Sequence, residues 1–235
     1  MFAIYSRELK SYFYTPIGYI FCGMFLVVSG LLFAYTTLFM QSTTAIGEYF
    51  IYLMAVFAIL LPLLTMKLFA EDRRTRTDQI LLTSPVSVVG IVLGKYLAAL
   101  TIFGVTFVVN SFNFVLLFKY GSPNMTSIFM NILGLFLLGA AFIAVGVLLS
   151  SLTENQLIAA VSAIGVNGAM LLISLLAGSI ESTFWRTVFK WFSVIDRFVP
   201  FTNQMLDVSA IVYYISLAAV AIFITTRGIE KRRWA

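Results

Sequence analysis

The sequence contains six long apolar runs, at residues 17–40, 49–69, 96–118, 127–149, 157–178 and 208–226. Asp, Glu, Lys and Arg are absent from all of them except for Lys67, near the end of the second run. The hydrocarbon core of a bilayer is about 30 Å thick, so a helix that rises about 1.5 Å per residue crosses it in roughly 20 residues. We therefore expect an all-α, polytopic membrane protein in which one transmembrane domain, residues 1–235, contains six transmembrane helices.

The composition agrees with a membrane protein and argues against the soluble classes. Hydrophobic residues make up 61% of the chain, charged residues make up 11%, and the mean hydropathy is +1.00. A soluble domain carries roughly 25% charged residues. The net charge of +5 does not indicate nucleic-acid binding, because that function needs a basic stripe on a soluble face. We expect the lipid bilayer as the surrounding phase and no nucleic-acid partner.

Lys and Arg are distributed unevenly between the two sets of loops. Lys119, Arg186, Lys190 and Arg197 fall on one side, and the other 11 of the 15 fall on the side of both termini and of the segment 71–85. Positive residues accumulate on the cytoplasmic flank of short loops. The number of runs is even, so the N- and C-termini share a side, and we expect both to be cytoplasmic.

The residues that would support chemistry inside the membrane are missing. The chain has no His, no run contains Asp or Glu, and Cys22 is the only cysteine. This pattern argues against an enzyme, a metal centre or a proton-coupled carrier, although a secondary carrier stays open as an alternative. The stretch from Gly90 to Tyr96 is one residue short of a phosphate-binding loop and ends in Tyr. We expect no catalytic residue and no bound cofactor in this chain, and we expect Gly94 and Lys95 to begin the third span, with the lysine reaching the inner interface.

Residues 1–15 are predicted to form a helix that lies flat on the membrane and ends at Pro16. Its apolar face would consist of Phe2, Tyr5, Leu9, Tyr12 and Phe13, and Arg7, Glu8 and Lys10 would lie away from that face. Such a helix is either a simple interfacial anchor or a functional elbow.

Residues 184–198 are predicted to form a second amphipathic helix, at the outer leaflet, ended by Pro200. Phe184, Val188, Phe192 and Ile195 share one face, and Arg186, Lys190, Ser193 and Arg197 share the other. This helix is either part of a surface aromatic belt or a lid over an exit path.

Three asparagines lie within the apolar runs, at Asn110, Asn113 and Asn167. A polar side chain in hydrocarbon is costly unless it is paired, so these residues must face protein or water. They are candidates either for a translocation pathway or for hydrogen bonds between helices.

The segment 71–85 is a charged, helix-forming stretch on the basic side of the protein. Glu71 and Asp72 would lie at a helix N-terminus, where the helix dipole favours anions, and Pro85 would end the helix. Ile80, Leu81 and Leu82 form an apolar cluster beside the arginines, which suits a groove on a soluble partner. The alternative is a solvated loop that its arginines hold against anionic lipid.

The stretch 71–95 resembles the segment after the second span of the type-2 ABC exporter permeases, which in that family is the coupling helix. Four further stretches resemble this family: residues 7–13 (Arg-Glu-Leu-Lys-Ser-Tyr-Phe), 15–19 (Thr-Pro-Ile-Gly-Tyr), 150–156 (Ser-Ser-Leu-Thr-Glu-Asn-Gln) and 231–234 (Lys-Arg-Arg-Trp). The likeness covers essentially the whole chain and is strongest to the permease subunits of gliding-motility-associated ABC transporters. The chain departs from the pattern at Arg76, where the family usually has Gly, and at Asp78, which replaces a common apolar residue.

The resemblance implies an architecture and a set of partners. It implies a permease subunit in the inner membrane of a bacterium, paired with a second copy or a paralogous permease. It also implies a separate dimeric ABC ATPase, which would hold the ATP and Mg, and it allows an auxiliary subunit on the outer face. Docking into the ATPase would fall to Glu71, Arg73, Arg74, Thr77, Gln79, Ile80 and Leu82, with a second contact through Glu154 and Asn155.

A second function is compatible with the same residues. A membrane subunit can relay ATPase motion to an envelope or motility complex without transporting anything. Both functions predict the same ATPase docking, so the sequence leaves them open. It also leaves open the transported substrate, because fold and family do not fix it.

Overall fold

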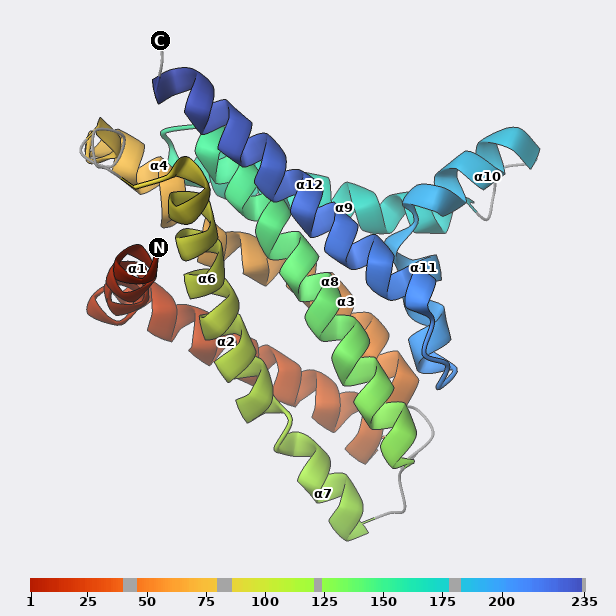
Figure 1. Cartoon of the computed structure of the whole chain (residues 1–235). Coiled ribbons are helices and arrows are strands. Elements are labelled where there is room, and N and C mark those ends of the chain that lie inside the picture. The colour runs from red at the N-terminus through yellow and green to blue at the C-terminus, as the bar shows by residue number, and fades with distance from the viewer. Residues whose placement is uncertain (40–45, 80–85, 121–123, 178–182, 234–235) are drawn as a thin grey trace.

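The computed structural model describes residues 1–39, 46–79, 86–120, 124–177 and 183–233. This part of the chain is helical and contains no strand (Figure 1). The helices are α1 (Phe2–Tyr14), α2 (Pro16–Phe33) with a π-helical continuation (Ala34–Phe39), α3 (Ile46–Thr65), α4 (Lys67–Arg74), α6 (Val88–Asn110), α7 (Asn113–Tyr120), α8 (Met125–Leu152), α9 (Gln156–Ala177), α10 (Thr183–Phe192), α11 (Val194–Thr202) and α12 (Val208–Arg233). Six helical stretches among these residues are long and apolar enough to cross a membrane, as the sequence predicts.

α8 is the central helix of the bundle, and it packs against α3, α6, α9, α11 and α12. Two glycines allow its neighbours to approach closely. A Cβ atom at Gly139 would overlap the ring of Phe103, and one at Gly146 would overlap the side chain of Thr65. Small residues at helix crossings are the usual way in which transmembrane helices gain close contact.

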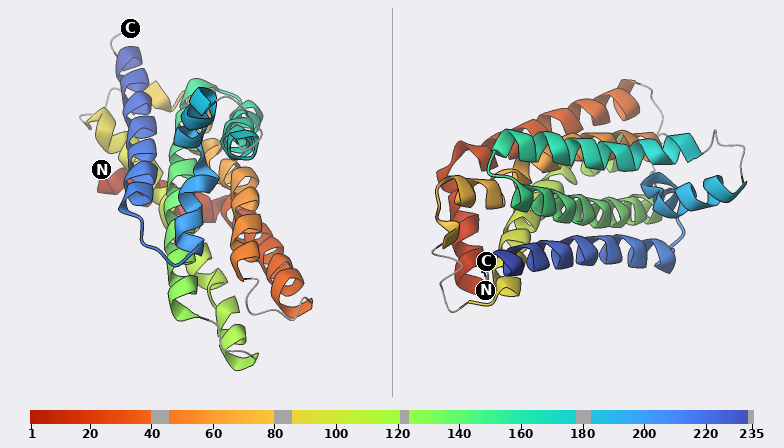
Figure 2. Two further views of the ribbon diagram at one scale, coloured as in Figure 1. Left: turned by 90° about the vertical axis from the view of Figure 1, so that its right-hand side faces the viewer. Right: turned by 90° about the horizontal axis from the view of Figure 1, so that it is seen from above.

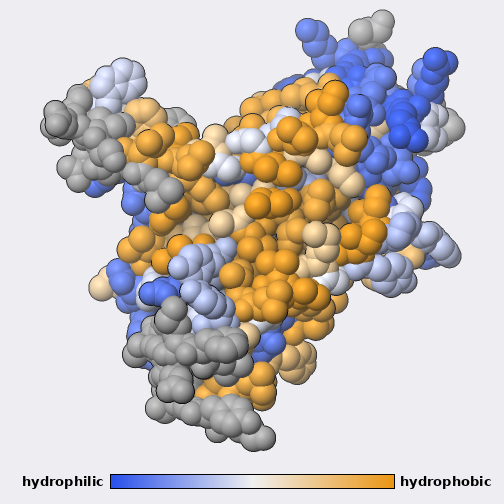
Figure 3. Space-filling view, turned by 180° about the vertical axis from the view of Figure 1, so that it is seen from behind, coloured by the Kyte–Doolittle hydropathy of each residue, from blue (hydrophilic) through white to orange (hydrophobic). Residues whose placement is uncertain are grey.

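The outer helices present apolar side chains to the surroundings of the bundle. Val27 on α2, Val161 on α9 and Phe223 on α12 are each more than half exposed. Figure 3 shows a broad apolar surface, with the larger group of hydrophilic residues at the upper right of the view and a smaller group at the lower left. This arrangement suits a protein whose surrounding solvent is lipid, because apolar side chains are stable there without being buried in protein.

The two termini lie at the same end of the bundle, near α1, α4 and the start of α6 (Figure 2). This agrees with the even number of spans. At the opposite end, α10 projects away from the other helices (Figure 1).

The third spanning stretch differs from expectation in its bounds and its continuity. It begins at Val88, where the hydroxyl of Ser87 accepts a hydrogen bond from the Gly90 amide, so Lys95 lies about two turns inside α6. The expectation that Gly94 and Lys95 begin this span is therefore wrong, and Lys95, which is only 1% exposed, is enclosed by protein. The stretch is also broken at Ser111, between α6 and α7.

The N-terminal helix forms as predicted, but its buried face is different. Ile4, Glu8 and Tyr12, spaced four residues apart, face the protein. Phe2 and Phe13, expected on the same face as Tyr12, are exposed. Glu8 was expected to lie away from the buried face, and that expectation is wrong because the carboxylate pairs with a lysine of α6.

The single helix expected at residues 184–198 is two helices. The hydroxyl of Ser193 accepts a hydrogen bond from the Asp196 amide and so caps the start of α11, which separates it from α10. Pro200 does not end the second helix, because α11 continues to Thr202. A local cap has overridden the amphipathic pattern here.

Candidate functional site

The charged segment after α3 is built differently from the expected helix. Glu71 and Asp72 lie in the later turns of α4, which begins at Lys67, so the helix N-terminus expected at Glu71 is wrong. The helix ends at Arg74, and Thr75 to Thr77 form a turn. A new helical stretch begins at Asp78, and Ile80 and Leu82 lie outside the described residues.

The turn is closed by hydrogen bonds back to α4. The Thr77 amide donates to the Asp72 carbonyl at 2.9 Å, and the Thr77 hydroxyl donates to Asp72 Oδ1 at 3.0 Å. Between them, Arg76 adopts a left-handed conformation with a φ of 58°. This is the position where the resembled family has Gly, and Gly is the residue that adopts this conformation without a steric penalty.

Arg73 connects this segment to the loop between α8 and α9. Its guanidinium donates to the Ser151 carbonyl and to Glu154 Oε1, at 3.2 Å and 3.1 Å. Arg232 of α12 donates to the same Ser151 carbonyl at 3.2 Å. The structure therefore brings together Arg73 and Glu154, two of the residues predicted to couple the chain to an ATPase, although 81 positions separate them in the sequence.

Asn155 has a local structural role. Its side-chain oxygen accepts a hydrogen bond from the Leu157 amide at 2.9 Å, at the start of α9. Beside it lies a groove with a volume of about 510 Å³, formed by side chains of the α3–α4 junction, of α4 and of the α8–α9 loop. Its lining residues are Met66, Arg74, Glu154, Asn155, Gln156 and Leu157.

Two arginines at this surface carry charge that the chain itself does not neutralise. Arg74 and Arg76 are both exposed, and among the described residues neither forms an ion pair. Both are available to an acidic surface on a partner. Gln79, also predicted to dock, is exposed at the end of the described segment.

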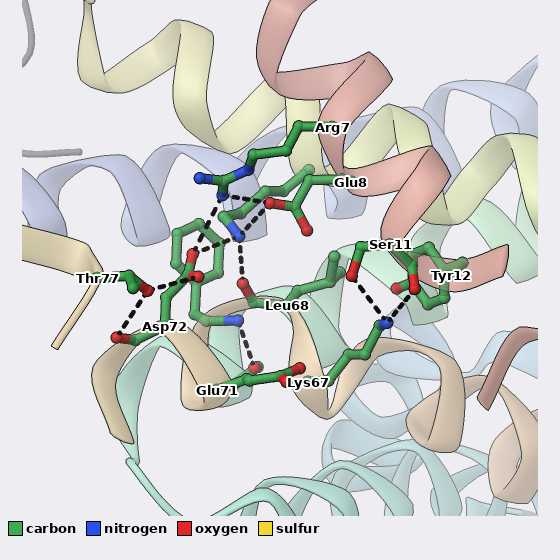
Figure 4. A network of polar contacts seen from close by, with 12 residues as sticks. Arg7, Glu8, Ser11, Tyr12, Lys67, Leu68, Glu71, Asp72 and Thr77 are labelled. Carbon is green, nitrogen blue, oxygen red and sulfur yellow. Dashed lines mark hydrogen bonds and ion pairs between the residues drawn. The ribbon is translucent and has the colours of Figure 1, made fainter. Parts of the chain in front are cut away.

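An ionic cluster connects α1, α4 and α6, and Asp72 joins it to the turn through Thr77 (Figure 4). Lys95 Nζ lies 2.9 Å from Glu8 Oε1 and 2.7 Å from Asp72 Oδ2, and it also donates to the Leu68 carbonyl. Arg7 pairs with Glu8 and lies 3.7 Å from Asp72. Two cations and two carboxylates thus neutralise one another at the junction of three helices.

The cluster alters the titration of Arg7. Partial burial lowers the pKa of Arg7, but the hydrogen bond to Glu8 and the charges of Glu8 and Asp72 outweigh that effect and raise it. The guanidinium therefore stays charged.

A second lysine fastens α1 to α4. Lys67 is 3% exposed, and its ammonium donates to the Ser11 carbonyl at 3.3 Å and to the Thr15 hydroxyl at 2.9 Å. It also lies 4.3 Å from the centre of the Tyr12 ring. Sequence reasoning missed this cluster, and the only signal for it was that Glu8 lies four residues from both Ile4 and Tyr12.

The predicted asparagines fall into two groups. Asn110 Nδ2 donates to the Tyr49 hydroxyl of α3 at 2.9 Å, and Asn113 Nδ2 donates to Asn110 Oδ1 at 3.0 Å. This pair bridges the break between α6 and α7 and connects it to α3. Asn167 on α9 is fully buried, and its amide has no hydrogen-bond partner among the described residues. A role for any of the three in a pathway stays a prediction.

Comparison with known protein families identifies a match. A family model described as "ABC-2 family transporter protein" matches residues 6–227, which is nearly the whole chain. No curated protein matches it.

Proposed function

Because the chain belongs to the ABC-2 family of transporter proteins and is a multi-pass permease component of an ABC transporter, we propose that a separate ATPase drives it through the charged end of the bundle. The docking surface in this proposal consists of Arg74, Arg76, Gln79, Glu154 and Asn155. We also propose that this end is cytoplasmic, so that both termini face the cytoplasm of a bacterium.

The observation that carries this proposal is the pair of unneutralised arginines beside the groove. Arg74 and Arg76 are exposed at the end that also contains both termini. The positive-inside rule places that end in the cytoplasm, where ATP is available. An acidic face on the ATPase, with apolar side chains that enter the groove beside Leu157, would complement this surface in both charge and shape.

The mechanism follows from the fixed geometry of the docking surface. ATP and Mg would bind between two ATPase subunits, and closure of those subunits would move the α4 and α8–α9 surfaces together, because Arg73 and Glu154 connect them. A bundle of six spans would form one half of the path, and a second permease copy or a paralogue would form the other. The displacement would switch the pair between two packings.

The docking surface is tested by reversing its charge. In the double variant Arg74→Glu/Arg76→Glu, we expect at least a tenfold loss of the ATPase that co-purifies with the chain. Lys190→Glu, at an exposed residue of α10, is the matched control and should retain the complex. Recovery of a full complex from the double variant would contradict the proposal.

Sidedness is tested separately by cysteine labelling. In a Cys22→Ser background, Arg76→Cys and Lys190→Cys are exposed in intact cells to a maleimide that cannot cross the membrane. We expect labelling of the second and protection of the first. Labelling of Arg76→Cys in intact cells would place the docking surface on the wrong side.

We propose as a second candidate that the chain relays ATPase motion to an envelope complex, as in a gliding-motility system. The observation that favours it is α10, which projects from the far end of the bundle with Phe184, Trp185 and Trp191 exposed (Figure 1). A photo-crosslinking residue in place of Trp191 should then capture an envelope protein in an ATP-dependent manner. Crosslinks to lipid alone would instead assign α10 to the aromatic belt.

A further inference from the structure

Lys95 occupies the point at which three helices of the charged end are held together. It is a residue of α6, it pairs with Glu8 of α1, and it pairs with Asp72 of α4. The Lys95 ammonium donates hydrogen bonds to Glu8 Oε1 and to the Leu68 carbonyl, and its ion pair with Asp72 adds a third contact. Its burial excludes water as a substitute partner.

The carboxylate of Asp72 extends this connection to the docking surface. One of its oxygens, Oδ2, faces Lys95, and the other accepts the Thr77 hydroxyl. Thr77 directly follows Arg76. A continuous chain of hydrogen bonds and ion pairs therefore runs from the turn of the docking surface, through Asp72 and Lys95, to Glu8 on α1 (Figure 4).

The far end of α1 is held as well. Lys67 of α4 donates to Thr15, the residue that separates α1 from α2. A Cβ atom at Gly18 would overlap the Tyr12 carbonyl, so the two helices meet without intervening space. A displacement of α1 is therefore passed to the start of the first span.

Separation of these groups is unfavourable. A buried charge that loses its partner keeps its desolvation penalty without the compensating attraction. Movement of the cluster as one body therefore costs less free energy than separation of Lys95 from Glu8 and Asp72. On this basis we infer that Lys95 is a positioning residue that makes α1 and the start of α2 follow the ATPase-driven displacement of the docking surface, an inference that rests on the proposed function.

The test measures movement of α1 in the complete complex. Spin labels are attached at Lys10→Cys on α1 and Arg227→Cys on α12, both exposed positions, in a Cys22→Ser background. The complex with its ATPase is placed in nanodiscs, and the distance between the labels is measured without nucleotide and after trapping with ATP, Mg and vanadate. We expect the distance distribution to shift on trapping in the otherwise unchanged chain.

Two variants interrupt the chain of contacts in different ways. Lys95→Met combined with Glu8→Gln removes the α1–α6 pair without leaving one of its charges unpaired. Asp72→Asn removes the ion pair between α6 and α4 at a partly exposed position, keeps the Lys95–Glu8 pair, and leaves the Leu68 carbonyl as the α4 partner of Lys95. Both should retain the ATPase and reduce the trapping-induced shift, because Lys67 still connects α4 to the end of α1. Glu48→Gln, the same kind of change at an exposed residue of α3, should keep the shift.

The possible failures are distinct. If the trapped complex shows no shift, or if both variants keep the shift of the unchanged chain, Lys95 has no positioning role and the inference is overturned. Loss of the ATPase from the Lys95→Met/Glu8→Gln variant would also overturn it, because the cluster would then shape the docking surface. Failure of the unchanged chain to co-purify with the ATPase would instead refute the proposed function. This co-purification is measured before any label is attached.

Discussion

Replacement of Lys95 by Met should destabilise the protein strongly, even without an ATPase. The substitution removes the ammonium that lies 2.9 Å from Glu8 and 2.7 Å from Asp72, and it leaves both carboxylates in place. Removing one partner of a buried ion pair costs about 3–5 kcal/mol. The lower part of that range applies, because Arg7 remains paired with Glu8 and Asp72 keeps its Thr77 contact.

The expected loss of about 3 kcal/mol converts to a measurable change in thermal stability. For a chain of this length, 1 kcal/mol corresponds to roughly 2–4 °C in Tm, so the variant should melt about 6–12 °C lower. The assay is thermal denaturation of the detergent-purified chain, followed by tryptophan fluorescence and by the soluble fraction in size-exclusion chromatography. Lys231→Met, at an exposed residue of α12, is the matched control and should melt with the unchanged chain.

A neutral version of the cluster separates charge from packing. The triple variant Lys95→Met/Glu8→Gln/Asp72→Asn leaves no uncompensated carboxylate, and the one charge that remains is that of Arg7, whose side chain is about half exposed. Replacement of buried ion pairs by neutral groups is often nearly neutral in free energy. We expect it to recover most of the stability that the single variant loses. A single variant that melts within about 2 °C of the unchanged chain, which corresponds to a loss of at most about 1 kcal/mol, would refute the reasoning. A triple variant as unstable as the single one would also refute it, because packing would then explain the loss.

The remaining predictions concern single sites and use the same melting assay. Gly146→Ala should lower stability by about 1–3 kcal/mol because its Cβ overlaps Thr65. Gly23→Ala, with nothing within 4 Å of the new atom, should be neutral or stabilising. Equal effects of the two substitutions would contradict the packing argument. The backbone at Arg76 is left-handed, so Arg76→Gly should leave the stability of the isolated chain unchanged or raise it by up to about 1 kcal/mol. Arg76→Ile should lower the stability for the same reason. A loss of stability with Gly would count against a steric penalty at this position. Burial, with the charges of Glu8 and Glu71, raises the pKa of Tyr12 well above its usual value of 10.0. Above pH 10 the unfolded chain therefore binds fewer protons than the folded chain. The contribution of this residue to stability then falls by up to about 1.4 kcal/mol per pH unit. Tyr12→Phe should flatten that alkaline slope, and an unchanged slope would show that another group is responsible.

Several features of the chain could be derived from short stretches of sequence. The absence of charge from runs of about 20 residues fixes which segments are stable in hydrocarbon, since an unpaired charge there is costly wherever the helix packs. The even number of these runs predicts the shared side of the two termini, and the helical spacing of apolar residues predicts the helix at residues 1–15. The family likeness also rests on local stretches, and the match to residues 6–227 agrees with it.

Local signals of equal strength competed at other places, and the sequence did not indicate which would prevail. The amphipathic pattern at 184–198 was overridden by the cap at Ser193. The charged stretch after the second span was predicted to start a helix at Glu71, but α4 starts at Lys67 and the turn falls at Arg76. In both cases a few hydrogen bonds decided a helix boundary, and boundaries are less strongly determined than the presence of a helix.

The buried cluster depends entirely on tertiary structure. Glu8 and Lys95 are 87 positions apart, and Arg73 and Glu154 are 81 positions apart. The sequence alone gives each of these residues the properties of an ordinary interfacial charge, because the partner in the other helix lies 87 or 81 positions away. Whether a charge faces water or another charge depends on which helices are neighbours, and the placement of α1, α4 and α6 decides that. The sequence therefore determined that this chain lies in a membrane and which end is positive, whereas the packing of its helices determined which of those charges are exposed to a partner and which hold the helices together.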